Sequence, residues 1–337
     1  MKAVSIAIVG ATGLVGTTTL SLLEERKFPI KNLFLLASKR SQGEMRNFRG
    51  RSYPVQVIDD FDFSQADISF FCVGNDLSAV FAPKAAASGC IVIDKSSYFR
   101  YDPDVPLIVP EVNLVDLPGY KKKNIIANAN CSTIPIAVAI KPLYDAVGIA
   151  RLNIATYQSV SGTGKEAVAE LQEQTQQSLV GEKIQPKVYP QQIAFNVIPH
   201  CDDFQENNYT REEMKMVWEL QKIFNDKMLA INPTAVRVPV YYGHSAAVHI
   251  ETKKKITAQQ AMELLAKAPG VKLITGTYPY PTPVKEAAGT DDVFVGRVRE
   301  DISHERGLNL WVVADNLRKG AALNAIQVAE ALLAAPL

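Results

Sequence analysis

The sequence has few cysteines and almost no net charge, and these shortages exclude several classes of protein. Its four cysteines among 337 residues are widely spaced and form no CxxC pair, so we expect neither a disulfide framework nor a metal site. The 36 basic and 35 acidic residues nearly cancel, so no overall field favours nucleic acid or an acidic membrane surface. No apolar run reaches the ~18 residues of a membrane span, and MKAVSIAIVG is typical of a strand rather than a signal peptide. We therefore expect a cytoplasmic protein with reduced thiols.

The segment VSIAIVGATGLVGTTTLSLLEER combines an apolar run of strand length, a glycine-rich turn and a helix. Its glycines are spaced as GxxGxxG, a variant of the dinucleotide fingerprint. Gly10 permits the tight turn, Gly13 lets the backbone approach a pyrophosphate, and Gly16 lets helix and strand pack closely. Because a strand precedes this turn and a helix follows it, the segment predicts a dinucleotide site.

Four more apolar runs follow, with a helix LSAVFAPKAAASG among them; they are NLFLLAS, ISFFCVG, CIVID and NIIAN. This alternation predicts an α/β fold with a doubly wound, Rossmann-type sheet. The second run ends in Ala37-Ser38-Lys39-Arg40-Ser41, without the acid that usually holds the ribose of NAD. Arg40 could bind a 2′-phosphate bidentately, so the sequence predicts NADP. An exposed basic loop is the alternative.

After Gly148 the pattern changes to alternating strands and amphipathic helices. KEAVAELQEQTQQSL predicts a helix, and further helices are expected over residues 212–227, capped by Thr210, and from residues 256–257 through 267. The strands RLNIATYQ, TAVRVPV, SAAVHIETKK and GLNLWVVAD suit an antiparallel sheet with one face covered by helices. The final NLRKGAALNAIQVAEALLAAP predicts an apolar helix that returns to the first domain. The sequence thus predicts a Rossmann domain, residues 1–130 with 316–337, and an α+β domain, residues 131–315.

The thiol of Cys131 lies where a structural cysteine is not expected. IIANANCSTIP ends an apolar run with two asparagines and places the cysteine just before a predicted helix. Ser132 and Thr133 are N-cap residue types, and Pro135 suits a first helical turn. The helix dipole and the unpaired N–H groups of a helix start favour a thiolate. On this segment alone, a small core residue at a strand–helix corner is the alternative to a nucleophile.

Only four histidines could serve such a nucleophile as a base. His249 alternates within a strand, His200 lies in a polar loop and His304 in a charged segment, and these settings favour structural roles. His244 follows a glycine at the entry to a strand, seven positions after Arg237. Because a cysteine nucleophile needs a base near neutral pH, His244 is the candidate.

The chain resembles the bacterial aspartate-β-semialdehyde dehydrogenase family over nearly its whole length. The matching segments, in the family's order, are GATGLVG, ASKRSQG, SSYFR, VPEVN, NANCST, TYQSVSGTG, EEMKMVWE, RVPVYYGHS and VVADNLRKGAALNA. The resemblance implies NADPH-dependent reductive dephosphorylation of L-aspartyl-4-phosphate to L-aspartate 4-semialdehyde through a Cys131 thioester. This reaction belongs to lysine (diaminopimelate), threonine and methionine biosynthesis. The resemblance also implies a homodimer, or a dimer of dimers, built on the second domain, which would be catalytic and substrate-binding.

Position by position, the resemblance also implies the site residues. Cys131 would be the acyl-accepting nucleophile, His244 the general acid/base, and Gln158 would orient the acyl intermediate. Arg237 would bind the substrate carboxylate and Glu212 its ammonium group. Phosphate would be bound by Arg100, Lys215 and Asn130, and NADP by Gly10, Thr12, Gly13, Leu14, Val15, Ser38, Arg40, Ser41, Ser161, Gly162 and Asn316.

Two segments depart from the family's pattern. The family usually has Asp-Asn-Ser-Ser where this chain has Asp94-Lys95-Ser96-Ser97, and Cys72-Val73-Gly74-Asn75-Asp76 replaces a loop of small residues. Both lie near the cofactor in the family, so contacts with the nicotinamide are not carried over.

Three other functions, and one other interpretation of an ion pair, are weighed against this prediction. N-acetyl-glutamyl-phosphate reductase shares the chemistry, but its acylated substrate amine has no need of Glu212. A glyceraldehyde-phosphate-type dehydrogenase has an Asn-Cys corner in a different motif. A catalytically inactive NADP-binding scaffold would not need Cys131 and His244 together.

Glu212 and Lys215 lie three positions apart on one predicted helix face. For this pair, the alternative to substrate binding is a surface ion pair worth ~0.3 kcal/mol.

Overall fold

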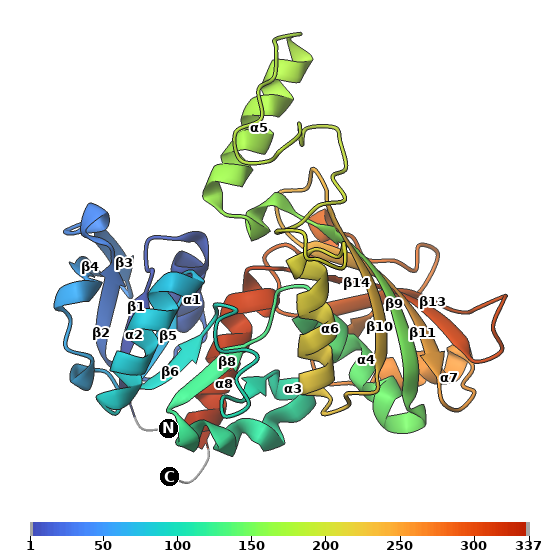
Figure 1. Cartoon of the computed structure of the whole chain (residues 1–337), viewed down its shortest axis with the longest axis horizontal. Coiled ribbons are helices and arrows are strands. Elements are labelled where there is room, and N and C mark those ends of the chain that lie inside the picture. Colours follow the sequence, from blue (N-terminus) through green and yellow to red (C-terminus); the bar gives the residue numbers. More distant parts are fainter. Residues whose placement is uncertain (1–2, 335–337) are drawn as a thin grey trace. The chain divides into compact units, whose positions relative to one another are not determined.

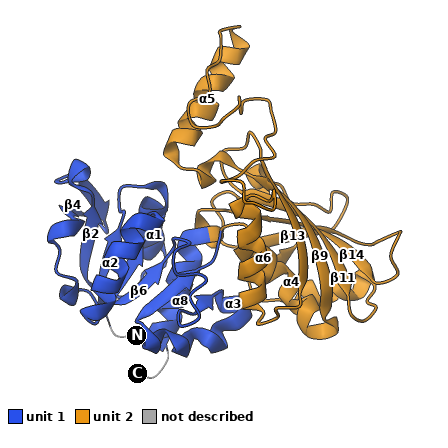
Figure 2. Ribbon diagram, viewed as in Figure 1, with its two compact units in different colours: residues 1–130, 321–337 blue, residues 131–320 orange. Residues whose placement is uncertain are grey.

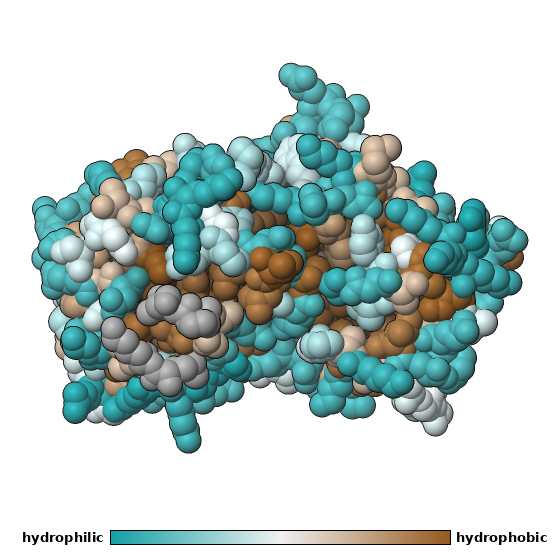
Figure 3. All heavy atoms as spheres, turned by 90° about the horizontal axis from the view of Figure 1, so that it is seen from below, coloured by the Kyte–Doolittle hydropathy of each residue, from teal (hydrophilic) through white to brown (hydrophobic). Residues whose placement is uncertain are grey.

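The computed structural model describes residues 3–334 and divides the chain into two compact units, each built on its own sheet (Figures 1 and 2). The first unit runs through Asn130 and resumes at Ala321, and the second unit is Cys131–Gly320. No helix of residues 3–334 is long and apolar enough to cross a membrane. On the face drawn in Figure 3, hydrophobic side chains appear in patches between hydrophilic ones.

The sheet of the first unit has eight strands in the order β3-β4-β2-β1-β5-β6-β8-β7. All neighbours pair in parallel except β3 and β4. Strand order reverses between β1 and β5, and ligands of such sheets bind outside the carboxyl ends of the strands at this point. The strands are β1 (Val4–Val9), β2 (Ile30–Ala37), β3 (Met45–Phe48), β4 (Arg51–Val57), β5 (Ile68–Phe71), β6 (Ile91–Asp94), β7 (Leu107–Ile108) and β8 (Ile125–Asn128).

The helices of the first unit include the last helix of the chain. They are α1 (Leu14–Glu25), α2 (Asn75–Ala87), α3 (Pro110–Asn113) and α8 (Leu323–Ala334). Of these, α1, α2 and α8 pack on this sheet, and α3 contacts α8. Ile6 of β1, Leu23 of α1 and Ile326 of α8 belong to one buried apolar cluster. The apolar C-terminal segment therefore completes the core of the first unit, while its last predicted residues, 335 and 336, lie outside the described residues.

The prediction of a doubly wound Rossmann-type sheet is confirmed, although three of its strands were missed. β3 and β7 are short, and β4 contains Pro54 and alternates buried with exposed residues, so none forms an apolar run. The five predicted runs correspond to β1, β2, β5, β6 and β8, and the predicted helix corresponds to α2. Apolar runs thus revealed the strands that are buried on both faces.

The second unit contains a six-stranded sheet in the order β10-β9-β11-β14-β13-β12. The prediction of an antiparallel sheet is wrong at both edges, because β10 is parallel to β9 and β12 is parallel to β13. Alternation of apolar residues indicates a half-buried strand but not the direction of its neighbour. The strands are β9 (Ile149–Gln158), β10 (Ala230–Arg237), β11 (His244–Thr252), β12 (Val271–Leu273), β13 (Val293–Glu300) and β14 (Gly307–Ala314).

Helices of the second unit lie against this sheet, apart from α5, which extends away from it (Figure 1). Thr210 caps α6 through a capping box with Glu213, as its sequence predicts, but the helix ends at Ile223 instead of residue 227. Asn225 has a φ of 47°, which the helix cannot continue. The helices are α4 (Thr133–Val147), α5 (Lys165–Leu179), α6 (Arg211–Ile223) and α7 (Ala258–Leu265).

Candidate active site

The Cys131 thiol and the His244 imidazole are in contact within the second unit. Cys131 directly precedes Ser132, the N-cap residue of α4, and His244 opens β11. Sγ of Cys131 lies 3.3 Å from Nε2 of His244. The sequence predicted both residues separately, and the fold brings them together at a helix start, where a thiolate is favoured.

The backbone around His244 fixes which ring nitrogen carries the proton. The N–H of Ser159 donates to Nδ1 of His244 at 3.0 Å. Because an N–H group can only donate, Nδ1 is the acceptor and the proton of the neutral ring lies on Nε2, facing Cys131. Burial, assisted by the charge of Arg237, lowers the pKa of His244 to about 3. The imidazole is therefore neutral at physiological pH and presents an N–H to the sulfur.

Gln158 and Arg237 are register partners in the parallel pair β9–β10. Nε2 of Gln158 donates to Glu212 at 3.1 Å, and its Oε1 accepts from Thr156 at 3.0 Å, so the amide orientation is fixed. Nη1 of Arg237 donates to the carbonyl of Ser159 at 2.8 Å. Nε of Arg237 is buried and has no hydrogen-bond partner among the described residues. An unsatisfied donor on a buried guanidinium is a ready site for an anionic ligand.

Lys215 and Glu212 form an ion pair that also includes Asp202. Nζ of Lys215 lies 2.6 Å from Asp202 and 3.1 Å from Glu212. Burial opposes the charge of Lys215, but the two carboxylates outweigh it and raise the pKa of this ammonium. Glu212 is 7% exposed, so the interpretation as an exposed surface pair is wrong. Asp202 was not predicted, because it lies in an irregular loop with no pattern that points to α6.

Three residues predicted to contact NADP lie around His244. Oδ1 of Asn316 accepts from Ser161 at 3.2 Å and from the backbone N–H of Gly243 at 2.9 Å. A Cβ added to Gly162 would lie 3.2 Å from Nε2 of His244. Ser159, which the sequence did not single out, joins this network by donating to Asn316 at 3.1 Å. That Ser161, Gly162 and Asn316 contact NADP stays a prediction.

The glycine turn of the first unit has the geometry of a phosphate cradle. Gly10 has a φ of 81°, and a Cβ added to it would lie 2.5 Å from the carbonyl oxygen of Cys72. A Cβ on Gly16 would lie 2.1 Å from the carbonyl oxygen of Gly10, so only glycine allows α1 to pack this closely on the turn. Gly13 is the N-cap of α1 and no acidic residue lies in the first turn, which leaves the N–H groups of the helix start open to an anion.

The basic turn after β2 lies beside this cradle. Ser38 precedes the short turn Lys39–Ser41, and Oγ of Ser41 contacts Oγ1 of Thr12 at 3.4 Å. Arg40 is exposed, so its guanidinium can reach a ligand on the cradle. These residues fit a dinucleotide that carries a 2′-phosphate.

Arg100 and Asn130, two of the residues predicted to bind phosphate, follow β6 and β8 in the first unit. Both are buried, and Nη2 of Arg100 donates to the carbonyl of Lys95 at 2.8 Å. Lys215 belongs to the second unit. A phosphate site formed by all three residues stays a prediction.

Comparisons with known proteins agree on one family. The model of the semialdehyde dehydrogenase NAD-binding domain matches residues 5–118, and that of the semialdehyde dehydrogenase dimerisation domain matches residues 140–319. Aspartate-semialdehyde dehydrogenase of Shewanella sp. (strain DB6705) is 57% identical over 98% of this chain and 97% of its own. That of Legionella pneumophila is 58% identical over 97% of this chain and 95% of its own.

A solved structure of aspartate semialdehyde dehydrogenase II from Vibrio cholerae, complexed with ASA, superposes with a TM-score of 0.97. It is 55% identical and covers 99% of both chains. These likenesses extend over both units and confirm the resemblance that the motifs carry. The chain belongs to the aspartate-semialdehyde dehydrogenase family of oxidoreductases.

Proposed function

We propose that this chain is an NADPH-dependent aspartate-semialdehyde dehydrogenase, which reduces L-aspartyl-4-phosphate to L-aspartate 4-semialdehyde and releases phosphate. The observation that carries the proposal is the 3.3 Å contact between Cys131 and His244 at the start of α4. Relatives of this name that are 57% and 58% identical support it. The enzyme acts in the cytoplasm, in the biosynthesis of lysine through diaminopimelate, of threonine and of methionine.

Cys131 is the nucleophile of this reaction. Its thiolate attacks the acyl carbon of the substrate, a carbon–sulfur bond forms, and the bond to the phosphate oxygen breaks. Backbone N–H groups at the start of α4 stabilise the oxyanion of each tetrahedral intermediate, a contribution of about 3 kcal/mol per donor. NADPH supplies the hydride that reduces the thioester, after which the thiolate leaves and the aldehyde forms.

In this tautomer His244 acts chiefly as a hydrogen-bond donor. The bond from Ser159 to Nδ1 leaves the proton on Nε2, so the neutral ring can donate a hydrogen bond to the thiolate and then to the oxyanion that replaces it. A base that removed a proton from the thiol would need a free lone pair on Nε2, which this tautomer lacks. The geometry therefore supports a thiolate that exists before substrate binds.

Substrate recognition is assigned to Arg237, Glu212 and Gln158. The described residues give the buried Nε of Arg237 no hydrogen-bond partner, so it suits one oxygen of the α-carboxylate, and the planar guanidinium suits both oxygens. Glu212 offers the opposite charge for the α-ammonium group, and Gln158, hydrogen-bonded to Glu212, orients the acyl group. A buried carboxylate beside the pocket favours a free amino acid over an N-acetylated one. Lys215, Arg100 and Asn130 bind the phosphate.

The cofactor is NADP. The cradle of Gly10, Gly13 and Gly16 supports binding of a pyrophosphate, and Arg40 supports selection of a 2′-phosphate. Thr12, Leu14, Val15, Ser38 and Ser41 line the same turns, and Ser161, Gly162 and Asn316 are the contacts assigned from the second unit.

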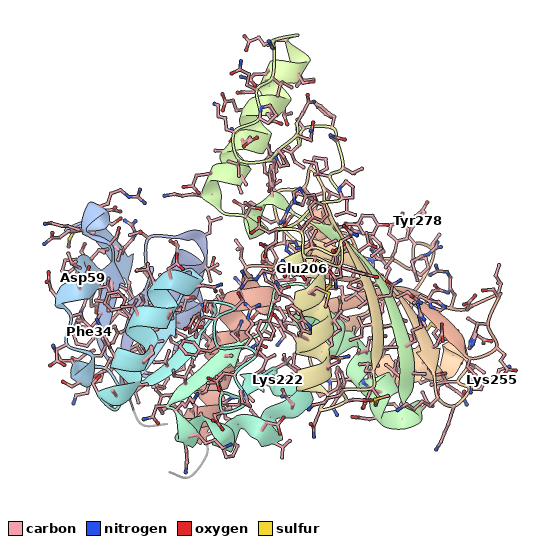
Figure 4. The ribbon with its side chains drawn as sticks, in the orientation of Figure 1. Phe34, Asp59, Glu206, Lys222, Lys255 and Tyr278 are labelled. Atoms are coloured by element: carbon pink, nitrogen blue, oxygen red, sulfur yellow. The ribbon has the colours of Figure 1, made fainter. Side chains whose placement is uncertain are left out.

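The enzyme forms a homodimer, or a dimer of dimers, through the second unit. Support comes from the match to a dimerisation domain and from the sheet face opposite α4, α6 and α7, which contact the other face. Tyr157 and Trp311 pack on that face with ring centroids 5.4 Å apart, beside a cavity of about 370 Å³ lined in part by Tyr280 and Pro281. Tyr278, which is labelled in Figure 4 and lies two residues before Tyr280, is 74% exposed. Sedimentation of the protein at several concentrations measures the assembly, and a monomer throughout would contradict it.

One assay tests the reaction. Aspartate semialdehyde, phosphate and NADP⁺ should give NADPH absorbance with the wild-type protein. Cys131→Ala should abolish turnover and leave NADP binding intact, whereas Cys201→Ala, which removes a buried thiol, should keep both. Wild-type turnover in Cys131→Ala would disprove the thioester mechanism, and binding of NADP without turnover in the wild type would favour the inactive scaffold.

A further inference from the structure

A second thiol of the chain has a charged partner that the proposed reaction does not use. Cys72 directly follows β5, and Lys95 directly follows its parallel neighbour β6. Phe71 and Asp94 are register partners, so the next residue of each strand extends from the same edge of the sheet. Nζ of Lys95 lies 3.3 Å from Sγ of Cys72. Each residue belongs to one of the two segments in which the sequence departs from the family's pattern.

The Nζ of Lys95 has the Cys72 sulfur and one hydroxyl as its hydrogen-bond partners. Nζ donates to Oγ1 of Thr19 on α1 at 2.6 Å, and the described residues place no carboxylate within ion-pair distance of it. The neighbouring Asp94 is engaged by Ser78 and Ser96 at 2.7 and 2.6 Å. Burial lowers the pKa of Lys95, and the Cys72 sulfur is the main opposing influence. The lowered pKa of Lys95 favours its neutral amine, whose nitrogen lies in contact with the Cys72 sulfur.

Cys72 differs from the buried thiols in both exposure and chemistry. It is partly exposed, whereas Cys90 and Cys201 are buried and burial raises the pKa of each to about 11. Thiolates, rather than thiols, react with peroxides, and of these three thiols Cys72 is the one with a lysine nitrogen 3.3 Å from its sulfur.

We propose that Cys72 is a peroxide-sensitive thiol whose oxidised sulfur is captured by Lys95 in a reversible sulfur–nitrogen cross-link. Hydrogen peroxide is the oxidant. The thiolate attacks one peroxide oxygen, the O–O bond breaks, and the hydroxide that leaves takes a proton to become water, which gives a sulfenic acid. The lone pair of neutral Nζ then attacks the sulfur, the S–O bond breaks, and the hydroxide leaves as a second water with a proton from nitrogen. A thiol reductant reverses the cross-link.

The cross-link lies at the nucleotide cradle. The carbonyl oxygen of Cys72 lies where a Cβ on Gly10 would clash, and the N–H of Cys72 donates to Val9 of β1 at 2.8 Å. Bonding Nζ to sulfur also draws it from Thr19, on the helix that opens the cradle. We therefore expect the oxidised protein to bind NADP at least several-fold more weakly. This effect rests on the proposed cofactor site, but the cross-link itself does not.

Peptide mapping of the whole protein tests the cross-link. After brief treatment with hydrogen peroxide and alkylation of free thiols, the peptides of Cys72 and Lys95 should be joined, with a mass lower by two hydrogens than their sum. Dithiothreitol should separate them. In Lys95→Met the joined peptide should be absent and Cys72 should react with peroxide at least tenfold more slowly. Thr19→Val removes only the hydroxyl and should still form the cross-link. Cys90 is the internal control in the same digest, and we expect it to remain a free thiol.

Peptide mapping of the wild-type protein alone can contradict the proposal, so the test does not depend on whether a variant folds. If Cys72 is still alkylated as a free thiol once Cys131 has been oxidised, or if it stops at a sulfenic acid without joining Lys95, the proposal is wrong. The NADP affinity of peroxide-treated wild-type protein should be compared with that of Cys72→Ser treated in the same way. Because Cys131 is oxidised in both proteins, the difference between them measures the effect of the cross-link. A cross-linked protein with unchanged NADP affinity would overturn that effect, and an unoxidised protein that binds no NADP would instead contradict the proposed function.

Discussion

The backbone N–H of Ser159 donates to Nδ1 of His244, and this bond determines which nitrogen faces Cys131. The hydroxyl of Ser159 lies 3.1 Å from the same nitrogen and 3.1 Å from Oδ1 of Asn316, so it can donate to either. Since the backbone N–H of Ser159 would oppose a proton on Nδ1, the doubly protonated ring is disfavoured. The arrangement keeps the imidazole neutral and directs its single proton toward the reacting sulfur.

Acid should destabilise the protein through His244. Burial lowers the pKa of this residue to about 3, whereas the unfolded chain titrates near 6.5. Between these pH values the unfolded state binds a proton that the folded state excludes. The contribution of neutral His244 to the free energy of unfolding is therefore complete above pH 6.5 and is lost as the pH falls toward 3. The expected loss at pH 5 relative to pH 8 is about 2 kcal/mol. Urea unfolding at both pH values measures it.

The matched variants for that experiment are His244→Gln, which cannot titrate, and His200→Gln, which removes a histidine that stacks on Phe204. The loss at pH 5 should disappear in the first variant and persist in the second. An equal loss in all three proteins would show that His244 does not carry it.

Gly162 should be required for turnover. A Cβ at this position would lie 3.1 Å from Nη1 of Arg237 and 3.2 Å from Nε2 of His244, so one of these side chains must move by a few tenths of an ångström. Because a small misplacement of catalytic groups can reduce rates strongly, we expect Gly162→Ala to lower kcat about 100-fold at nearly unchanged thermal stability. Gly119→Ala, where the added Cβ makes only an ordinary contact with Pro106 at 3.7 Å, is the control. Unchanged kcat in Gly162→Ala would show that the pocket adapts.

The sequence predicted the parts of the molecule whose physics is local. Glycine spacing identified the cradle of Gly10 and Gly16, and the capping box of Thr210 identified the start of α6. Cys131 was recognised because a helix start is visible in the sequence. Each of these features depends on residues within a few positions of one another.

The contacts that complete the site were not predictable, because they join segments without a shared pattern. Ser159 acts on His244 through its backbone N–H, which every residue except proline carries. Asp202 reaches Lys215 from an irregular loop, and the parallel pairing of β10 with β9 depends on the path of the chain between them. The departures at Cys72 and Lys95 were visible, but only the register of β5 and β6 shows that they meet.

Arg40 should discriminate NADP from NAD. It is exposed on the turn after β2, and a lost charged hydrogen bond to the 2′-phosphate is worth about 2 kcal/mol. Arg40→Ala should therefore weaken NADP binding roughly 30-fold and leave NAD binding within about twofold. Lys39→Ala, one residue earlier, is the control, because it removes a positive charge from the same turn. If the contact of Arg40 is specific, Lys39→Ala should weaken NADP binding less than Arg40→Ala does. Equal weakening of both cofactors in Arg40→Ala would show that this residue does not recognise the 2′-phosphate.

Glu212 and Lys215 should affect different substrates, although they share one ion-pair cluster. Glu212 is assigned to the ammonium group, so Glu212→Gln should raise the KM for aspartate semialdehyde more than that for phosphate. Lys215→Ala should raise the KM for phosphate, and it should also lower thermal stability, because it leaves the carboxylates of Glu212 and Asp202 without their shared cation.

Asp202→Asn separates these two consequences. It removes one carboxylate from the cluster and keeps Lys215 charged through Glu212, so stability should change while both KM values stay within about twofold of wild type. The exposed pair Lys141–Asp145 provides a control, since an exposed ion pair contributes little. If Glu212→Gln and Lys215→Ala lose stability but keep wild-type kinetics, the cluster is structural, and the preference for a free amino acid must come from elsewhere in the pocket.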